Sequence, residues 1–395
     1  MSQPAVYVVS AARTAIGSFG AALKDVPLAT LASTAVKAAL ARSSVPADAV
    51  GHLVMGNVIP TEPRDAYLSR VAAMDAGLPK EVPAFNVNRL CGSGLQAIVS
   101  AAQSLLLGDA EIAIGAGAES MSRGPYLVTA GRWGIRMGDS TLLDYTLGVL
   151  HDPFGRIHMG VTAENVAAKF GITRDMQDAL ALTSHQRAVA AIAEGRFKNQ
   201  IVPVEVPGRK GPTLFEVDEH PRADTSLESL GKMRAAFKKE GGSVTAGNAS
   251  GINDGAAAVM LATEAAVKRL NLTPLARLVG YAHAGVEPEL MGIGPVPAVR
   301  AVLKRTGLRI TDIDVIEANE AFAAQACAVA QELDFDPAKV NPNGSGISLG
   351  HPVGATGAII TVKAVHELQR IGGRRALVTM CIGGGQGIAA IFERV

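Results

Sequence analysis

Two periods of apolar and polar positions alternate along the N-terminal part of the chain. Nearly uninterrupted apolar runs at 5–11, 50–56 and 111–117 predict strands that are buried on both faces. Residues 28–42, and a second segment that follows Cys91, have the spacing of amphipathic helices. Strands that alternate with helices are typical of an α/β unit, so we expect a largely parallel, buried sheet.

The C-terminal part repeats this order of elements. The pattern predicts, in order, a strand at 275–283, a helix at 295–307, a strand at 314–322, a helix at 323–333, a helix after His351 and a strand at 375–383. Residues 45–58 superpose on 309–322 with one shift of 263 positions, since both 313 − 50 and 316 − 53 give that number. We therefore interpret the two parts as an internal duplication.

Residues 121–250 break this repeat. They are rich in Gly, Pro, Arg and Asp, and they contain one amphipathic helical pattern at 173–197. A segment of this length is too long for a plain loop and is usually a lid or a binding element. We expect an excursion with its own fold.

Composition and charge exclude several classes of protein. The 395 residues include 37 Lys and Arg against 36 Asp and Glu, so a net charge of +1 gives no global attraction to nucleic acid or to a membrane surface. Only 4% of the residues are aromatic, which argues against base-stacking platforms. No basic region precedes a long apolar core at the start, and no apolar run is expected to reach about 18 residues, so we expect a cytoplasmic protein.

Three cysteines carry the first chemical signal. Cys91, Cys327 and Cys381 are odd in number and lack CxxC spacing, so neither a disulfide framework nor a zinc site is indicated. Cys91 precedes a predicted helix, where unpaired N–H groups favour thiolate and predict a lowered pKa. It is either a nucleophile or a small buried hydrophobic residue. The flanking Gly92 and Gly94 favour a nucleophile, because they leave room for a substrate and backbone donors for an oxyanion.

His351 stands at the start of another helix, which Pro352 and Gly372 delimit. It lies 260 positions after Cys91, close to the shift of the repeat, so the duplication puts a cysteine and a histidine at equivalent helix starts. A lone histidine is most often a surface or core residue. This placement instead makes His351 a candidate base for Cys91.

A third candidate group lies near the C-terminal strands. In TMCIGGGQGIAA (379–390) an apolar strand leads Cys381 into a run of glycines that lacks the Lys-Ser/Thr pair of a P-loop. We interpret it as an acid/base thiol beside backbone donors rather than a nucleotide site. Asn319, in EANEAF, ends a predicted strand and offers an amide that can hold a water or a carbonyl; Cys327 is expected to pack in the core.

Five motifs, in this order and spacing, identify a family. The sequences NRLCGSGLQA, GNASGINDGAAA, EANEAFAAQ, NPNGSGISLGHPVGATGA and CIGGGQG together resemble the thiolases, the acyltransferases of coenzyme A metabolism, over essentially the whole chain. HDPFGRIHMGVTAEN and TMCIGGGQGIAAIFER further resemble the broad-specificity β-ketothiolases of bacteria that store polyhydroxyalkanoate. The implied metabolism is polyhydroxyalkanoate biosynthesis or fatty acid metabolism.

The resemblance implies a role for each candidate in making or cleaving short-chain 3-ketoacyl-CoA. Cys91 would carry the acyl group as a thioester, His351 would activate it, and Cys381 would move the α-proton of acetyl-CoA. Asn319, through a water, would form one oxyanion hole with His351, and the backbone N–H groups of Cys91 and Gly383 would form the other. Acyl transfer and C–H deprotonation need different groups, so this division suits a Claisen condensation.

The resemblance also implies a coenzyme A site in the inserted segment. His158 and Ser250 would lie near the pantetheine, and Arg222 and Ser229 would lie toward the nucleotide, where Arg suits phosphate. Arg222 and Ser229 could instead be ordinary surface residues. Coenzyme A thioesters and free CoA are the implied partners as substrates, with no bound cofactor and no metal.

Two further residues concern substrate length. Met159 is implied to line the acyl pocket and to go with short chains, although a Met is otherwise most often core, and Phe322 belongs to the same substrate-binding set. The stretch NPNGSGISLG before His351 is closer to degradative and broad-range thiolases than to strictly acetoacetyl-CoA-forming ones. We therefore expect activity on 3-ketoacyl-CoAs of about four to six carbons.

The implied fold is a duplicated, five-layered αβαβα core with an inserted loop domain. We expect an N-terminal half at 1–120, completed by about 251–273, the loop domain at 121–250, a C-terminal half at 274–395, and a homotetramer. One alternative is a condensing enzyme of the ketoacyl synthase type, which would carry two histidines beside its cysteine. The other is a non-catalytic CoA-binding protein of this fold, which would have lost one member of the set.

Overall fold

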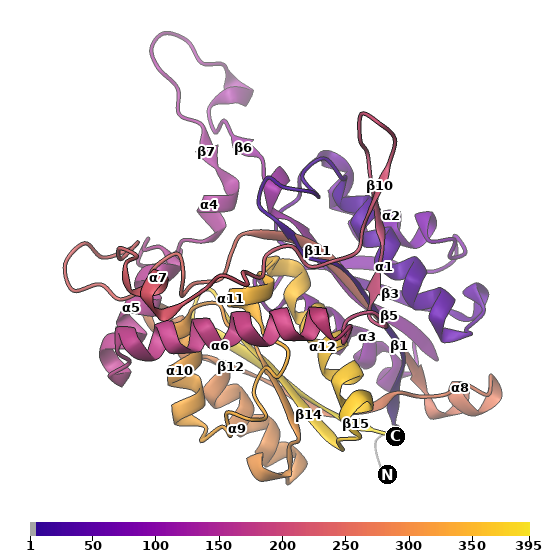
Figure 1. The fold of residues 1–395 in the computed structure, drawn as a ribbon. Helices are drawn as coiled ribbons and strands as arrows, with labels where there is room; N and C mark the ends of the chain where they lie inside the picture. Colours follow the sequence, from indigo (N-terminus) through magenta and orange to yellow (C-terminus); the bar gives the residue numbers. More distant parts are fainter. Residues whose placement is uncertain (1–4) are drawn as a thin grey trace.

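Residues 5–395, described by a computed structural model, form two halves that repeat one topology (Figure 1). In the N-terminal half the strand order is β4-β3-β5-β11-β1. The strands are β1 (Val6–Thr14), β3 (His52–Gly56), β4 (Ala84–Val87), β5 (Ile112–Ser120) and β11 (Asn253–Thr263). Because β11 lies between β5 and β1, the chain leaves the middle of this sheet after β5 and returns there at β11; on the way, the two-residue β8 (Ile201–Val202) pairs with β1.

The C-terminal half has the equivalent order β13-β14-β15-β12. The strands are β12 (Ala276–Gly285), β13 (Val315–Ala318), β14 (Arg375–Ile382) and β15 (Gln386–Arg394). A parallel bridge from Ile316 to Val340 stands where β4 stands in the first half. The halves join where β1 pairs with β12. The predicted duplicated α/β architecture is confirmed.

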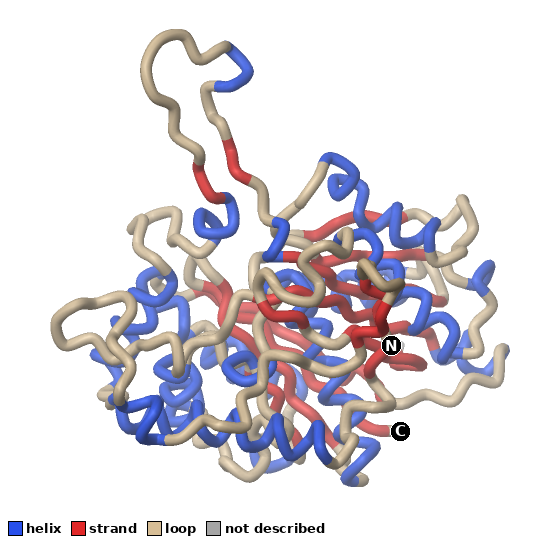
Figure 2. The backbone as a smooth tube through the Cα atoms, turned by 45° about the horizontal axis from the view of Figure 1, so that its top comes forward, coloured by secondary structure: helices blue, strands red, loops and turns tan. Residues whose placement is uncertain are grey.

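The helices complete five layers, with helices both between the sheets of the two halves and around them (Figure 2). Two helices lie between the sheets of the two halves, and the others cover the outer faces. The central helices are α3 (Ser93–Leu107) and α12 (Val353–Ile371); the outer helices are α1 (Leu28–Ser43) and α2 (Leu68–Asp75) on one side and α9 (Pro295–Thr306) and α10 (Ala323–Glu332) on the other. Burial of apolar side chains from both halves around α3 and α12 holds the layers together.

The two central helices touch through their backbones. A Cβ atom on Gly94 would lie 2.6 Å from the backbone nitrogen of Ala358, and one on Gly117 of β5 would lie 2.6 Å from the carbonyl oxygen of Gly354. Neither contact leaves space for a side chain. Glycine at these positions therefore lets the start of α3 and the start of α12 meet.

The expectation of a largely parallel sheet is wrong. The pairs β3–β4, β3–β5, β13–β14 and β1–β8 are parallel, whereas the pairs formed by β11, β12 and β15 are antiparallel. The sequence interpretation did not recognise β11 and β15 as strands. The run of Gly and Ala residues in β11 carries little strand signal, and β15, despite Ile388, Ile391 and Phe392, directly follows the glycine run that was interpreted as part of a site. The predicted strand at 314–322 is also shorter, ending at Ala318.

Between β5 and β11 the chain forms the segment that contains the predicted insertion. Its elements are β6 (Tyr126–Leu127), β7 (Leu143–Asp144), α4 (Tyr145–Val149), α5 (Met159–Phe170), α6 (Arg174–Ala193), β8 (Ile201–Val202), β9 (Val204–Val206), β10 (Thr213–Phe215) and α7 (Leu227–Gly231). A buried ion pair between Arg13 and Asp218, 2.7 Å apart, ties this segment to β1. Residues from β6 to β7 extend away from the body as an arm (Figure 1). Short elements elsewhere are β2 (Gly17–Ser18), α8 (Glu264–Arg269) and α11 (Gly346–Leu349).

The segment Leu90–Leu107 differs from expectation in one respect. It is 18 residues long with a mean hydropathy of 1.4, so by length and composition it matches a membrane-spanning helix. However, 67% of it is buried within the fold, where α3 lies between the two sheets. Its apolar character is that of a central core helix.

Candidate active site

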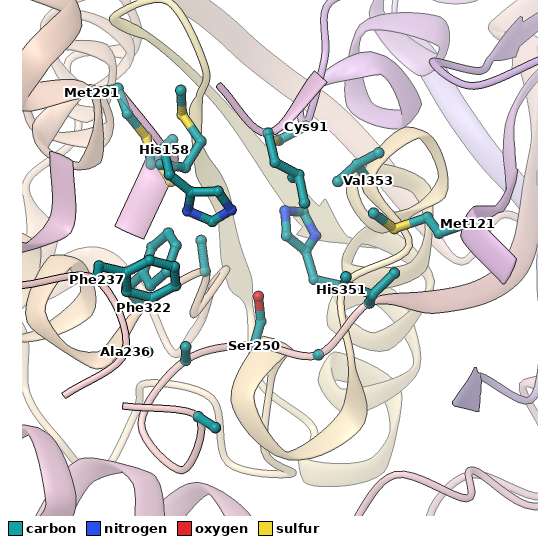
Figure 3. Close-up of a pocket in the computed structure, with 18 of the residues that line it drawn as sticks. Cys91, Met121, His158, Ala236, Phe237, Ser250, Met291, Phe322, His351 and Val353 are labelled. Carbon is teal, nitrogen blue, oxygen red and sulfur yellow. The ribbon is translucent and has the colours of Figure 1, made fainter. Parts of the chain in front are cut away.

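A cavity of about 370 Å³ lies where the two halves and the inserted segment meet. Cys91, His351 and Cys381 all line it, from the start of α3, the loop before α12 and the end of β14. Figure 3 shows Cys91 and His351 on one side and His158, Phe237 and Phe322 on the other. The tertiary structure thus brings together three residues that the sequence separates by up to 290 positions, since 381 − 91 = 290.

Cys91 stands in a tight turn directly before α3. Leu90, the preceding residue, has a φ of 46°, a left-handed conformation that is uncommon for a non-glycine residue. Burial raises the pKa of the Cys91 thiol to about 11, although hydrogen bonds from the backbone N–H groups of Gly383 and of Cys91 itself oppose the shift. The predicted lowered pKa is therefore wrong, because desolvation outweighs the helix start. A neutral thiol here needs a base.

His351 has the hydrogen bonds that such a base requires. Its Nδ1 lies 2.6 Å from Oγ1 of Thr356, which donates to the carbonyl of Pro352 at 2.9 Å. A hydroxyl has one proton, so Thr356 then accepts from Nδ1–H, and Nε2 is the unprotonated nitrogen that can accept a proton. Burial lowers the pKa of His351 to about 4, so the ring is neutral near pH 7. Its backbone N–H donates to Oδ1 of Asn253 at 2.9 Å.

Asn319 and Gly383 do not line the cavity themselves, but each lies beside a residue that does. Asn319 directly follows β13, and its Nδ2 lies 3.5 Å from Nε2 of His351. Its Oδ1 is buried and has no hydrogen-bond partner among residues 5–395. Gly383 directs its N–H at the sulfur of Cys91. Two sets of donors therefore lie at different places around the thiol and the imidazole.

The second thiol, Cys381, is fully buried at the end of β14. Burial and the nearby Cys91 raise its pKa well above the usual range. The glycines that follow make close backbone contacts: a Cβ on Gly385 would lie 2.3 Å from the carbonyl oxygen of Val286, and its φ is +82°. Only glycine fits this turn. Cys381 and Cys91 thus face one cavity as two protonated sulfurs.

The opposite wall is aromatic. The ring of His158 stacks on Phe237 with centroids 4.6 Å apart, and Phe237 meets Phe322 edge to face at 6.2 Å. Nδ1 of His158 accepts from the N–H of Gly160 at 3.0 Å and so caps α5. Burial, and secondarily His151, lower the pKa of His158. Met159 and Ser250 also line this cavity.

Comparison with known proteins agrees with this geometry. The model of the thiolase N-terminal domain matches residues 6–265, and that of the thiolase C-terminal domain matches residues 272–394. The chain belongs to the thiolase family. Beta-ketothiolase BktB of Cupriavidus necator is 66% identical over 99% of both chains, and an acetyl-CoA acetyltransferase of Chromobacterium violaceum is 50% identical over 98% of this chain and 99% of its own.

Solved thiolase structures agree in fold as well as in sequence. The crystal structure of human mitochondrial 3-ketoacyl-CoA thiolase superposes with a TM-score of 0.97 at 47% identity, covering all of both chains. A crystal structure of the same human enzyme in complex with CoA gives a TM-score of 0.96, with all of this chain and 98% of that one covered. The predicted thiolase fold and acyltransferase class are confirmed.

Arg222 and Ser229 lie apart from the thiols of this thiolase. They line a second cavity of about 290 Å³, which shares Ala246, Ala249 and Gly251 with the first. The two cavities are therefore neighbours in the surface of the inserted segment. Of the predicted site residues, these two are the ones placed outside the immediate surroundings of Cys91.

Sequence reasoning missed several residues of the thiolase site. Phe237 and Met291 line the first cavity, and His185 and His220 line the second. None of them lies in a quoted motif, so only the fold could place them. Thr356 could have been found from the sequence, because it lies five residues after His351 within GHPVGATGA. Among residues 5–395 no group of three or more His, Cys, Asp or Glu is arranged to hold a metal ion.

Proposed function

We propose that Cys91, His351 and Cys381 are the catalytic groups of a β-ketothiolase that makes or cleaves short-chain 3-ketoacyl-CoA. The chain is an acyltransferase of the thiolase family. The observation that carries the assignment of residues is the single cavity that two thiols and a neutral imidazole line. No other pair of cysteines in residues 5–395 shares a cavity, since Cys327 lies on α10 with its sulfur 3.7 Å from the carbonyl oxygen of Met176.

In the first half-reaction, Cys91 takes the acyl group. Its thiol proton passes to Nε2 of His351 while the sulfur attacks the thioester carbonyl of acyl-CoA. The oxyanion of the tetrahedral intermediate accepts hydrogen bonds from one of the two sets of donors. The carbon–sulfur bond to CoA then breaks, and the departing CoA thiolate takes the proton from His351. The products are free CoA and an acyl-Cys91 thioester.

In the second half-reaction, Cys381 acts on acetyl-CoA. Cys381 first gives its thiol proton to His351, and the resulting thiolate removes an α-proton from acetyl-CoA; the enolate oxygen is stabilised near Asn319 and His351. The enolate carbon attacks the acyl-Cys91 thioester, whose oxyanion accepts from the N–H groups of Cys91 and Gly383. Collapse releases 3-ketoacyl-CoA and leaves the Cys91 thiolate, which recovers the proton held by His351, while Cys381 keeps the α-proton. The reverse sequence is thiolysis.

Coenzyme A would lie along the two neighbouring cavities. The aromatic wall of His158 and Phe237 suits the pantetheine arm, and the guanidinium of Arg222 suits a phosphate of the nucleotide. The thioester supplies the electron sink for both half-reactions, so the proposal requires no cofactor. The apolar lining, which includes Met159 and Met291, favours acyl chains of about four to six carbons.

The arm between β6 and β7 supports a homotetramer. It exposes apolar side chains that a monomer would leave in water, with Trp133 at 87% and Met137 at 99% exposure. A second copy of the chain would cover such an arm. Because the arm leads through β7 into α4, and Leu150 after α4 lines the cavity, assembly would also order one edge of the site.

Three serine variants test the proposed function. Cys91→Ser should abolish labelling of the enzyme by radioactive acetyl-CoA, whereas Cys381→Ser should retain some acetyl-enzyme and lose carbon–carbon bond formation. Cys327→Ser is the matched control and should behave as the unmodified chain in both assays. Labelling that survives loss of Cys91 would overturn the assignment. Values of kcat/KM for 3-ketoacyl-CoAs of rising length test the substrate range, and a preference for long chains would contradict it.

The two alternatives are not favoured. A ketoacyl-synthase-type enzyme would place two histidines beside the nucleophile, whereas here Asn319 and Cys381 accompany His351. A non-catalytic CoA-binding protein would lack a member of the set, and all five candidate groups are present around one cavity or in contact with it.

A further inference from the structure

One buried carboxylate at the junction of the two halves has no part in the chemistry described above. Glu119 is the penultimate residue of β5 and is fully buried. Its oxygen Oε1 accepts from Nδ2 of Asn57 at 2.8 Å and from the N–H of Ile59 at 3.0 Å. Its oxygen Oε2 accepts from the N–H of Val58 at 3.1 Å and from the N–H of Gly354 at 2.8 Å. Four donors therefore converge on one side chain, two on each oxygen.

These donors belong to different halves of the molecule. Asn57, Val58 and Ile59 follow β3 in the N-terminal half, whereas Gly354 is in the first turn of α12, three residues after His351. The helix α12 has Pro352 at its N-cap, with no side-chain cap and no acidic residue in its first turn. A helix start needs acceptors for its free N–H groups, and an anion there is also favoured by the helix dipole. Glu119 supplies that acceptor from the other half.

Packing leaves no space for a side chain between Gly354 and the carboxylate. A Cβ on Gly354 would lie 2.5 Å from Oε2 of Glu119 and 3.0 Å from Cα of Asn57. Near this point the start of α3, which follows Cys91, meets the start of α12 through Gly94 and Gly117. The carboxylate thus holds the segment that bears His351 against the loop after β3, close to the segment that bears Cys91.

We propose that Glu119 is a positioning residue for the Cys91–His351 pair, joining the two halves through α12 and placing an ionisable carboxyl near the nucleophile. This inference rests on the roles proposed for Cys91 and His351. Burial is the main cause of the raised pKa of Cys91, and the charge of Glu119 adds to it, so the sulfur keeps its proton until His351 accepts it. Burial, and to a smaller extent Asp254 on β11, raises the pKa of Glu119 itself to about 8, whereas the N–H groups of Ile59, Gly354 and Val58 act against this shift. The Cys381 thiol is the other titratable group beside Cys91.

Replacing the carboxylate of Glu119 by an amide distinguishes a role in positioning the catalytic groups from a role in stability alone. In Glu119→Gln one of the two oxygens becomes an NH2 group, which cannot accept hydrogen bonds and would face two of the four N–H donors. We expect kcat to fall by about tenfold to a hundredfold with the KM for CoA changed by less than about twofold, because misplaced reacting groups affect turnover rather than binding. The pH midpoint for alkylation of Cys91 by iodoacetamide should move down by about one unit, because a negative charge is removed.

Two further variants complete the design. Glu119→Asp keeps the charge but is too short to reach all four donors, so kcat should fall while the alkylation midpoint stays within about 0.3 units of the unmodified chain. Asp65→Asn is the matched control: Asp65 is a buried acid that accepts from the N–H groups of Thr61 and Glu62 and has no contact with α12. It should lower stability and leave kcat and the alkylation midpoint unchanged.

The outcomes decide between the inference and the function on which it rests. A wild-type kcat and midpoint in folded Glu119→Gln would overturn the role of Glu119, and so would equal losses in Asp65→Asn. If Glu119→Gln does not fold, Glu119→Asp decides alone, and a wild-type kcat in that variant refutes the inference. Peptide mapping identifies the alkylated thiol. If the thiol whose alkylation abolishes activity is not Cys91, the proposed function is wrong, whatever the result for Glu119.

Discussion

Thr356 provides the sharpest test of the proposed base. It is the only side chain that bonds Nδ1 of His351 in residues 5–395, at 2.6 Å, and its own proton can go to the carbonyl of Pro352. Thr356→Val keeps the shape and removes the hydroxyl. Nδ1–H then loses its acceptor in a buried site, which costs about 1–3 kcal/mol.

The imidazole can escape this cost by moving its proton from Nδ1 to Nε2. In that tautomer Nε2 no longer accepts the thiol proton. Since about 1.4 kcal/mol corresponds to a factor of ten, the active tautomer should decrease by about 5- to 150-fold. We therefore expect the rate of acetyl-enzyme formation by Cys91, measured by rapid quench with radioactive acetyl-CoA, to fall by about 10- to 100-fold.

Thr361→Val is the matched control for this variant. Thr361 is also buried on α12, and its hydroxyl donates to the carbonyl of Gly357 at 2.7 Å, four residues earlier, as that of Thr356 does to Pro352. It does not contact His351. Thr361→Val should therefore acylate at the rate of the unmodified chain, and Thr356→Ser should regain most of the lost rate. Equal rates for Thr356→Val and Thr361→Val would refute the argument.

Three more predictions follow from the geometry. Because burial lowers the pKa of His351 to about 4, the acylation rate should show no acid limb until the pH falls below about 5, and a limb near pH 6.5 would contradict a neutral base. Arg222→Ala should raise the KM for CoA by about tenfold with little change in kcat, because the guanidinium lines only the second cavity, away from the thiols. Steady-state thiolysis measures both constants. If the arm holds the proposed homotetramer together, replacing Trp133 and Met137 by Ser should reduce the mass measured by sedimentation, and an unchanged mass would contradict that role of the arm.

The stability of the fold should also depend on pH in a defined direction. Burial lowers the pKa of His185, His283 and His351 to about 4 each, below the unfolded value near 6.5. Between these values the three histidines bind more protons in the unfolded chain than in the fold. Glu119 and Glu317, whose pKa burial raises to about 8 and about 7, act in the opposite direction. Because the histidines outnumber these two carboxyls, the free energy of unfolding should decrease as pH falls from about 6.5 to about 4. Urea midpoints across this range measure the effect, and a midpoint that rises on acidification would contradict it.

Much of the framework was predictable because it depends on local patterns. The helix after His351 was expected between Pro352 and Gly372, and α12 runs from Val353 to Ile371 with Gly372 in the left-handed conformation at its end. The shift of 263 positions between the two halves could be found for the same reason, since each half must bury the same kind of strands. The strand β11 was missed because its run of Gly and Ala carries little strand signal, and β15 was missed because it directly follows a glycine run; the sheet is therefore mixed rather than parallel.

The sequence by itself determined the family, the duplicated layers and the candidate groups, because motif chemistry and hydrophobic period are properties of short segments. Only the tertiary structure decided how those groups ionise. A helix start predicted a lowered pKa for Cys91, but desolvation depends on every neighbour and raises it instead. Nothing in GAGAES marked Glu119 either, because its four donors come from residues up to 235 positions away.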